Sequence, residues 1–369
     1  MRTFTWDEVS ARRLARQGLA EPAAGDVAGT VAAMCGAHAQ VMPAAEVSIG
    51  IRLSCATRAD VRRALWQERE LVKTHGPRGT VHLLATRDLP MWVGALSTLP
   101  VTNPHAADIR LNERQVGEVV SAIADACQGA ELTIDELSEE VVARTGPWAG
   151  ELVMPAFQTM WPRWRQAMAQ AAHRGAFVFG PNRGRRVTYT APPAFAPLSD
   201  SRAELVRHYL RAYGPATPEH FARWVGAPRP WAVAAFGLVE LEEVLLEGSA
   251  AYVLAGDTAD EGNCGGVRLL PYFDAYAVAG MPRELLFPGA AAQRALNRGQ
   301  AGNFPVLLVD GRVAGVWHQR RSGSKLEVRV ETLWPVDTAL IEEQVVRLGE
   351  IQEARANLTL GEVTVGAHA

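Results

Sequence analysis

The sequence predicts an α+β fold, and three observations lead to this prediction. The chain has 369 residues, more than one ordinary core needs, because domains usually hold ~100–200 residues. Three segments share one plan, in which short helices and a longer helix precede a strand, a turn with glycine and basic residues, and a second strand. The remaining segment alternates apolar and polar residues as strands do. The predicted architecture is a tandem winged-helix scaffold (helix-turn-helix with β-hairpin wings) with a C-terminal β-rich domain.

The first winged helix is predicted at residues 1–110. One helix begins near Pro43, because proline suits the first turn of a helix and disfavours the α conformation at Met42. A second helix follows Thr57, which is a good capping residue. The segment 75–84, HGPRGTVHLL, then has the glycines and apolar residues of a β-hairpin.

The second winged helix is predicted at residues 111–198. Thr133 with Glu136 three residues later is the signature of a capping box at a helix start. A helical region is expected around Pro162, followed by a hairpin over 176–190 that carries three arginines at its tip.

The third winged helix is predicted at residues 199–262, with two helices separated at Gly214 and Pro215 and with strands at its end. Thr217 is expected to cap the second of these helices. The β-rich domain is predicted at 263–369 and is closed by a helix over 337–358.

The overall charge and hydropathy limit the classes of protein. Hydrophobic residues make up 48% of the chain and the net charge is −3. No apolar run approaches the ~18 residues of a membrane span, and the amino terminus lacks the apolar centre of a signal peptide. We therefore expect a cytoplasmic protein without a membrane partner. Near-neutral charge argues against a wholly basic surface but leaves local basic patches open.

The sequence offers no pattern for a metal or a cofactor. The cysteines are too widely spaced for a zinc site and are expected to be reduced core residues: Cys35, Cys55, Cys127 and Cys264. The nine histidines form no HxxxH or HExxH pair, and neither a Walker loop nor a Rossmann glycine pattern occurs. We expect no metal and no cofactor.

Basic residues recur at the predicted hairpin tips, where they suit contact with phosphates. The predicted DNA-binding set is Lys73, Arg78, Thr80 and His82 in the first hairpin, Arg183, Arg185 and Arg186 in the second, and Trp317, His318, Arg320, Arg321 and Lys325 in the C-terminal domain. Its last members lie beside a thin Ser-Gly turn that suits a minor groove, with Trp317 and His318 as wedges. The alternative is that surface turns are polar whatever they bind.

His38 and Gln40 are separated by one alanine and precede the helix at Pro43. An extended segment would direct both side chains to one side, whereas a helix would direct them to different faces. The alternative is a pair of ordinary capping or core hydrogen-bonding groups, and the spacing by itself does not decide between the two.

Six runs along the chain resemble, in order, the AlkZ/YcaQ-type winged-helix DNA glycosylases. These runs are 35–53, 64–84, 174–184, 214–226, 269–280 and 305–317. The resemblance implies removal of alkylated bases from double-stranded DNA by a monomer. It also implies the role of the AlkZ branch, which protects antibiotic producers from their own DNA-alkylating natural products, including crosslinking agents.

The catalytic signature of that family is Gln, an apolar residue, then Gln in AlkZ-like members or Asp in YcaQ-like members. The signature aligns with His38, Ala39 and Gln40, so the second position matches the AlkZ-like type and the first departs from it. The resemblance implies that His38 and Gln40 are catalytic. No lysine adjoins the pair, which favours a monofunctional DNA N-glycosylase without a Schiff base.

The sequence thus predicts a hydrolase that cleaves the N-glycosidic bond of alkylated purines with bulky or crosslinked N7 or N3 adducts, for self-resistance to a DNA-alkylating natural product. The alternative is a non-catalytic winged-helix regulator or drug-sequestering protein, which the substitution at His38 keeps open. A regulator usually binds spaced half-sites as a symmetric dimer. A glycosylase surveys DNA as a monomer.

Overall fold

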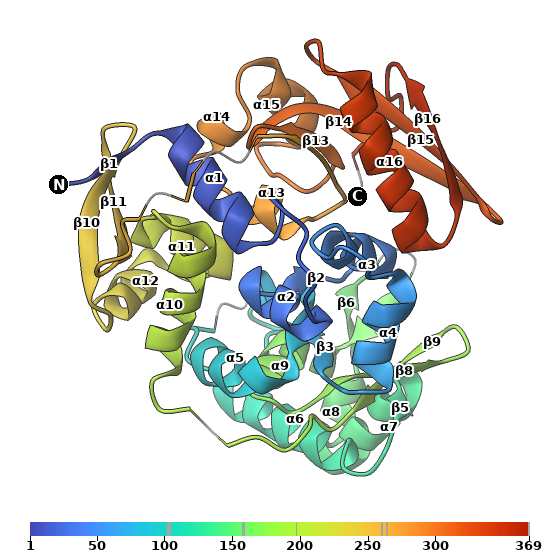
Figure 1. Ribbon diagram of the computed structural model, residues 1–369. Helices are drawn as coiled ribbons and strands as arrows, with labels where there is room; N and C mark the ends of the chain where they lie inside the picture. The colour runs from blue at the N-terminus through green and yellow to red at the C-terminus, as the bar shows by residue number, and fades with distance from the viewer. Residues whose placement is uncertain (102–104, 157–158, 197, 260, 263–264, 368–369) are drawn as a thin grey trace.

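The computed structural model describes residues 1–101, 105–156, 159–196, 198–259, 261–262 and 265–367. Helices and β-sheets alternate along the chain (Figure 1), so the expected α+β class is confirmed. Among the described residues the strands form a five-stranded sheet, three three-stranded sheets and a two-stranded hairpin.

The first unit is a three-stranded sheet covered by helices. Its elements are α2 (Val27–Ala33), β2 (Ala37–His38), α3 (Met42–Gly50), α4 (Arg58–Trp66), β3 (Leu71–His75), η1 (Pro77–Gly79) and β4 (Val81–Ala85). The strand order is β2-β4-β3, so the short first strand pairs with the far arm of the hairpin. Helix α3 has Pro43 in its first turn, as expected. Its residues share a core with Val61 and Leu65 of α4.

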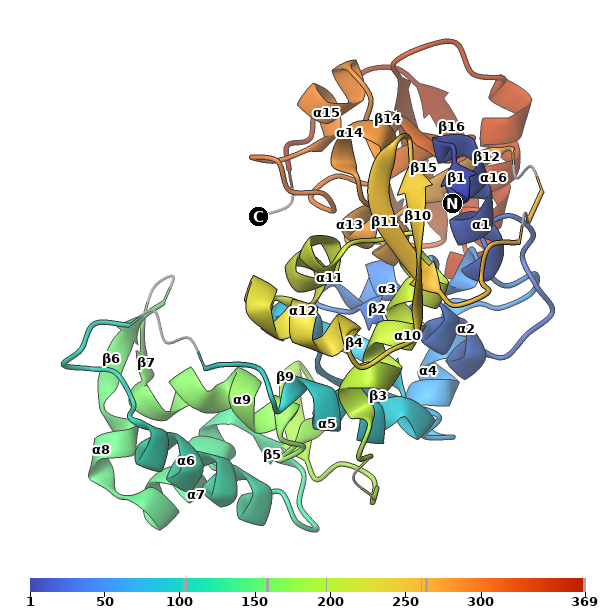
Figure 2. The ribbon, with the colours of Figure 1, turned by 90° about the vertical axis from the view of Figure 1, so that its left-hand side faces the viewer.

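The second unit repeats this order of elements. It consists of α6 (Glu113–Ala126), β5 (Leu132–Thr133), α7 (Ile134–Thr145), α8 (Pro147–Gly150), β6 (Leu152–Pro155), β7 (Met160–Pro162), η3 (Arg163–Ala167), α9 (Met168–His173), β8 (Val178–Arg183) and β9 (Arg186–Thr190). The strand order β5-β9-β8 matches that of the first unit. The expected capping box of Thr133 and Glu136 is present. This unit has its own core and stands to one side of the molecule (Figure 2).

The helical region expected around Pro162 is half wrong. The residues before this proline form the antiparallel hairpin of β6 and β7, and helical structure begins only at Arg163. Proline lacks a backbone N–H and disfavours the α conformation in the residue before it. Pro162 can therefore precede a helix, but it separates the helix from the chain upstream.

The third unit has the same arrangement again. It contains α10 (Ser201–Tyr213), α11 (Pro218–Val225), α12 (Arg229–Phe236), β10 (Leu241–Leu246) and β11 (Ser249–Leu254). A single bridge of Ala216 to Tyr252 takes the place of the short first strand. Thr217 caps α11 as expected. The linking elements η2 (Thr86–Asp88) and α5 (Leu89–Leu96) come from the first unit, and α5 packs against α10.

The C-terminal domain is a five-stranded sheet with the order β12-β13-β14-β15-β16. Its elements are β12 (Val267–Leu270), α13 (Ala275–Ala279), α14 (Arg283–Leu286), α15 (Ala290–Ala295), β13 (Val306–Val309), β14 (Arg312–Ser322), β15 (Lys325–Thr332), α16 (Thr338–Gln352) and β16 (Arg355–Leu360). The closing helix was expected to reach residue 358, but it ends at Gln352. Glu353 adopts a left-handed conformation there, and the following residues pair in parallel with β15.

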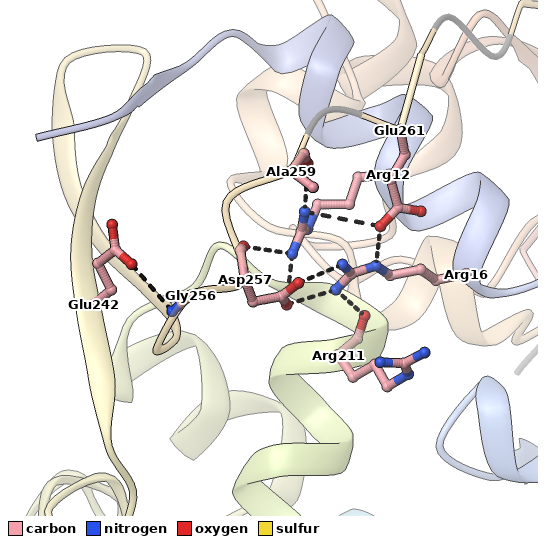
Figure 3. Close-up of polar contacts among 8 residues, drawn as sticks. All are labelled: Arg12, Arg16, Arg211, Glu242, Gly256, Asp257, Ala259 and Glu261. Carbon is pink, nitrogen blue, oxygen red and sulfur yellow. Dashed lines mark hydrogen bonds and ion pairs between the residues drawn. The ribbon is translucent and has the colours of Figure 1, made fainter.

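The amino-terminal residues, predicted in the first unit, form elements that join the third unit and the C-terminal sheet. Strand β1 (Thr3–Phe4) pairs with β10, and α1 (Trp6–Arg16) joins the core of the C-terminal sheet. Arg12 and Arg16 of α1 bind the segment after β11 (Figure 3). The guanidinium of Arg16 donates to both carboxylate oxygens of Asp257, at 2.8 and 2.7 Å, and its Nε donates to Glu261 at 2.5 Å.

This ion-pair cluster predicts acid sensitivity. The two arginines, mainly through the hydrogen bond from Arg16, lower the pKa of Asp257 to about 2. Its contribution to stability is present above the unfolded pKa and is lost as the pH falls from about 4 to about 2. Asp257→Asn should lower the free energy of unfolding at pH 7 by on the order of 1 kcal/mol after solvent screening. Urea unfolding should show this difference shrinking toward pH 2.

The control is Asp7→Asn, because Asp7 lies on α1, the helix that carries Arg12 and Arg16, in an exposed pair with Arg312. We expect it to change the stability little at any pH. A penalty for Asp257→Asn that is equally large at pH 2 and pH 7 would contradict the electrostatic explanation.

The cysteines follow the sequence prediction only in part. Cys35 and Cys127 are buried, as expected. Cys55 is exposed, which contradicts the prediction of a core residue, because it lies in the loop between α3 and α4. Cys264 lies outside the described residues. No helix in the described part of the chain is long and apolar enough to span a bilayer.

Candidate active site

His38 lies on β2, the short strand just before α3. It pairs with His82 of β4 in antiparallel register, and the N–H of Ala39 donates to the carbonyl of Val81 at 2.7 Å. Val41 is still extended, and the helix begins at Met42. The expectation that His38 and Gln40 lie outside a helix is therefore confirmed.

An aromatic ring covers His38 from the C-terminal domain. The imidazole stacks on Phe273 with 4.6 Å between ring centroids and 29° between ring planes. The ring of His82 approaches edge-on at 5.2 Å. As a result only 8% of His38 is exposed, and its Nδ1 is buried without a hydrogen-bond partner among the described residues.

Both imidazoles at this site are neutral at neutral pH. Burial lowers the pKa of His38 to about 4, and the positive charge of Arg78 contributes in the same direction. Burial also holds the pKa of His82 well below its usual range. The Nδ1 of His82 lies 2.8 Å from the carbonyl oxygen of Thr80, so a neutral His82 carries its proton on Nδ1. A neutral His38 has a nitrogen that can accept a proton from water.

Gln40 lies in the bend between β2 and α3 and is exposed, in contrast to His38. The site therefore combines a covered imidazole with an accessible amide two residues further along. An amide carbonyl accepts hydrogen bonds and an amide nitrogen donates them, so this side chain can orient a water without changing its charge.

A buried ion pair fixes Phe273 against His38. The guanidinium of Arg52, at the end of α3, donates to the two carboxylate oxygens of Asp274 at 2.8 and 2.9 Å, and neither side chain is exposed. Ser48 also donates to this carboxylate at 2.6 Å, and the carboxylate caps α13 by accepting from the N–H of Tyr276. The pair thus joins the helix after Gln40 to the residue after Phe273.

Sequence reasoning assigned no role to Phe273, Asp274 or Arg52. Two of them lie in the run LLPYFDAYAVAG, which contributed only to the family resemblance. A single aspartate in an otherwise apolar run is a usable signal, because a buried carboxylate requires a partner. The sequence does not indicate that the partner is Arg52, which is 222 residues away.

Two residues predicted to bind DNA are buried in the protein. Trp317 is 2% exposed, belongs to the core of the C-terminal sheet and donates its indole N–H to the carbonyl of Leu270 at 2.9 Å. It cannot act as a wedge, because β14 directs it to the covered face of the sheet. His82 is 4% exposed and belongs to the candidate active site. These two predictions are corrected.

The other predicted DNA-binding residues lie partly or fully at the surface. Exposed side chains are Arg78, Arg183, Arg185, Arg186, Arg320, Arg321 and Lys325, and half-buried ones are Lys73, Thr80 and His318. Arg183 and Arg186 form ion pairs with carboxylates of α7. Arg321 donates to the carbonyl of Gln352 at 2.7 Å. The surface basic residues are thus present at three hairpins, and part of their charge is already neutralised at the second.

Comparison with known proteins gives consistent matches over most of the chain. The family model described as DNA glycosylase AlkZ-like matches residues 31–354. A curated relative from Streptomyces sahachiroi, named interstrand DNA cross-link repair glycosylase, is 32% identical over 336 residues, which cover 85% of this chain and 87% of the relative. The solved structure of Streptomyces sahachiroi DNA glycosylase AlkZ has a TM-score of 0.81 and 27% identity, over 98% of this chain and 100% of that one.

The matched region includes His38, Gln40, Phe273 and the buried ion pair that joins them. Fold and site together define a DNA N-glycosylase, a hydrolase of the bond between base and sugar. The chain belongs to the DNA glycosylase AlkZ-like family.

Proposed function

We propose that the protein releases alkylated purines from double-stranded DNA, with His38 and Gln40 as its catalytic residues. The observation that carries this proposal is that a neutral, covered imidazole at His38 is followed two residues later by the exposed side chain of Gln40, outside a helix. A neutral imidazole and an amide are mild groups. They suffice because an N7- or N3-alkylated purine is cationic and leaves the sugar as a neutral base.

In the proposed reaction, Gln40 orients the attacking water with its carbonyl oxygen and stabilises the oxocarbenium-like sugar with the negative end of the amide dipole. His38 accepts the proton of that water or orients it. Phe273 limits the approach to the imidazole, because it covers one face of the ring. No step of this reaction requires a metal ion or an organic cofactor.

The proposed substrates are bulky or crosslinked N7 and N3 adducts, including those left by a DNA-alkylating natural product. The name of the Streptomyces sahachiroi relative, an interstrand cross-link repair glycosylase, supports this choice. Self-resistance of an antibiotic producer is the corresponding biological role. We also propose that the enzyme is monofunctional, acts as a monomer and works in the cytoplasm.

The proposed scaffold is three winged helices, at about residues 1–110, 111–198 and 199–262, followed by the C-terminal domain. The repeated order of helix, short strand, two helices and hairpin supports this assignment. The shared strand order of the first two sheets and the bridge of Ala216 to Tyr252 support it further.

The direct test is incubation with duplex DNA that contains one defined N7-alkylguanine. Release of the free base and an alkali-labile site in the DNA are the expected products. A protein that binds this DNA and releases no base would favour the non-catalytic alternative, a regulator or a drug-sequestering protein.

The hairpin of β14 and β15 gives a second prediction, because Arg320, Arg321 and Lys325 gather at its exposed tip. Replacing all three by alanine should weaken DNA binding. It should also reduce the log–log slope of affinity against salt by about 0.9 for each phosphate that the variant no longer binds. Fluorescence anisotropy at several salt concentrations measures this slope.

The matched control for the hairpin is Arg114→Ala, an exposed arginine of α6 in an ion pair with Glu118. Its slope should equal that of the wild-type protein. An unchanged slope in the triple variant would remove the hairpin from the DNA interface.

A further inference from the structure

A cavity of about 440 Å³ lies between α11, α13 and α14, and we call it the arginine cavity. Three guanidinium groups line it, from segments that are distant in the sequence: Arg78 from the turn of the first hairpin, Arg223 from α11 and Arg283 from α14. Residues of α11 and α13 both line the cavity, and Figure 2 shows the two helices next to each other, while α1 passes between them in the view of Figure 1. The fold therefore brings together positive charges that are not clustered in the sequence.

The arginines of the arginine cavity are not paired with carboxylates of the described part of the chain. No carboxylate lines it, and within the described ranges none of its three arginines forms an ion pair. Among the residues that the structure describes, the guanidiniums of Arg78 and Arg283 donate only to backbone carbonyls, of Trp224 and of α13 and Gly280 after it. The nearby carboxylate of Glu219 is engaged by another arginine, at the start of α12.

Arg223 is the most available of the three arginines. Its side chain is exposed and makes no hydrogen bond among the described residues. Burial, together with repulsion by Arg223 and Arg78, lowers the pKa of Arg283 to about 10. Like charges held this closely raise the free energy of the empty cavity, so a bound anion is favoured.

The arginine cavity adjoins the candidate active site. Val278, which lines the cavity, is separated from Phe273 by the backbone of Gly302. A Cβ added at Gly302 would lie 2.8 Å from Val278 and 3.0 Å from Phe273, so there is no room for a side chain between these two residues. On its other side Phe273 stacks on His38. An anion in the cavity would thus lie near the proposed reaction centre, with Gly302 and Phe273 between it and His38.

We propose that the arginine cavity binds a backbone phosphate of the DNA strand that carries the damaged nucleotide. This inference rests on the proposed function, which supplies a polyanion next to the site. The ligand is a phosphate rather than the adduct itself, because three positive charges would repel a cationic alkylpurine. Guanidinium groups also match a phosphate with paired N–H donors.

The first test compares Arg223→Gln with Arg229→Gln. Both variants remove one positive charge from an exposed arginine, and Arg229 lies on the adjacent helix α12, paired with Glu219 and outside the cavity. Arg223→Gln should lower the log–log slope of affinity against salt by about 0.9, whereas Arg229→Gln should leave it unchanged. Equal slopes in the two variants would overturn the proposal.

The second test locates the phosphate. Single methylphosphonates, which are neutral, are placed in turn at each position that flanks the adduct. At one position the modification should weaken binding by the wild-type protein and by Arg229→Gln more than it weakens binding by Arg223→Gln, since that variant has already lost one of the three guanidiniums proposed to bind the phosphate. If no position behaves in this way and inorganic phosphate instead stabilises the wild-type protein against heat, the cavity serves a free phosphate compound, and the proposal fails.

Base release in single turnovers at saturating enzyme separates this inference from the proposed function. Arg223→Gln should bind less tightly and still release the base. The salt slopes of Arg223→Gln and Arg229→Gln could differ as predicted while the wild-type protein releases no base. That result would overturn the proposed function and support the phosphate site. Base release with identical slopes would overturn the phosphate site alone.

Discussion

Replacing Gln40 by alanine is expected to abolish base release while leaving DNA affinity and stability nearly unchanged. The side chain is exposed and lies outside a helix, so its loss costs at most ~1 kcal/mol of net hydrogen bonding. In the proposed reaction, however, it orients the only nucleophile. Quantifying free base from DNA with one N7-alkylguanine measures the effect, and circular dichroism confirms the fold.

His38 gives the matching series of variants. His38→Ala should slow base release by ~10²–10⁴-fold if the imidazole acts as a general base. His38→Gln, which restores the usual residue of the family signature, should retain much more activity. Full activity in Gln40→Ala would contradict the assignment of Gln40 as a catalytic residue.

The pH dependence separates a base from a positioning group. An unperturbed imidazole would lose activity below about pH 6.5. Burial instead lowers the pKa of His38 to about 4, and the base form is the neutral one. Wild-type activity should therefore hold down to about pH 5 and fall through pH 4, while His38→Gln stays flat. Spontaneous base loss is subtracted and folding is checked at each pH, because charging a buried histidine also destabilises the native state. Identical acid limbs would leave His38 as a positioning group.

Removal of the carboxylate of Asp274 should give the largest loss of stability among these variants. Asp274→Ala leaves the guanidinium of Arg52 buried and unpaired and removes the cap of α13. Breaking a buried pair in this way costs ~3–5 kcal/mol. Urea unfolding measures this change. Base release should also fall, because the neighbouring Phe273 loses its fixed position against His38.

Two controls define the role of this ion pair. Replacing Arg52 and Asp274 together by methionine and leucine leaves no unpaired charge and should cost less than Asp274→Ala alone. Glu219→Ala, which breaks an exposed pair with Arg229, should cost ~0–1 kcal/mol. If Asp274→Ala lowered the free energy of unfolding no more than Glu219→Ala, the buried pair would not be what holds α13 against the segment that follows α3.

Sequence patterns predicted helix starts correctly, because capping involves residues close together in the chain. The capping box at Thr133, the cap at Thr217 and the helix that begins beside Pro43 formed as predicted, because each depends on residues within one turn. Errors arose where pairing decided the outcome. Residues 355–358 were predicted as helix, but they belong to β16 and pair with β15, an interaction that no local pattern specifies.

The sequence by itself determined the α+β class, the repeated units and the non-helical position of His38 and Gln40, because strand alternation, glycine turns and proline act over a few residues. The tertiary structure decided which side chains are covered. It buried Trp317 in the C-terminal core and stacked Phe273 on His38. It also brought Arg78, Arg223 and Arg283 to one cavity. These contacts join residues up to 235 positions apart, and their energies depend on burial and charge separation, which exist only once the chain has folded.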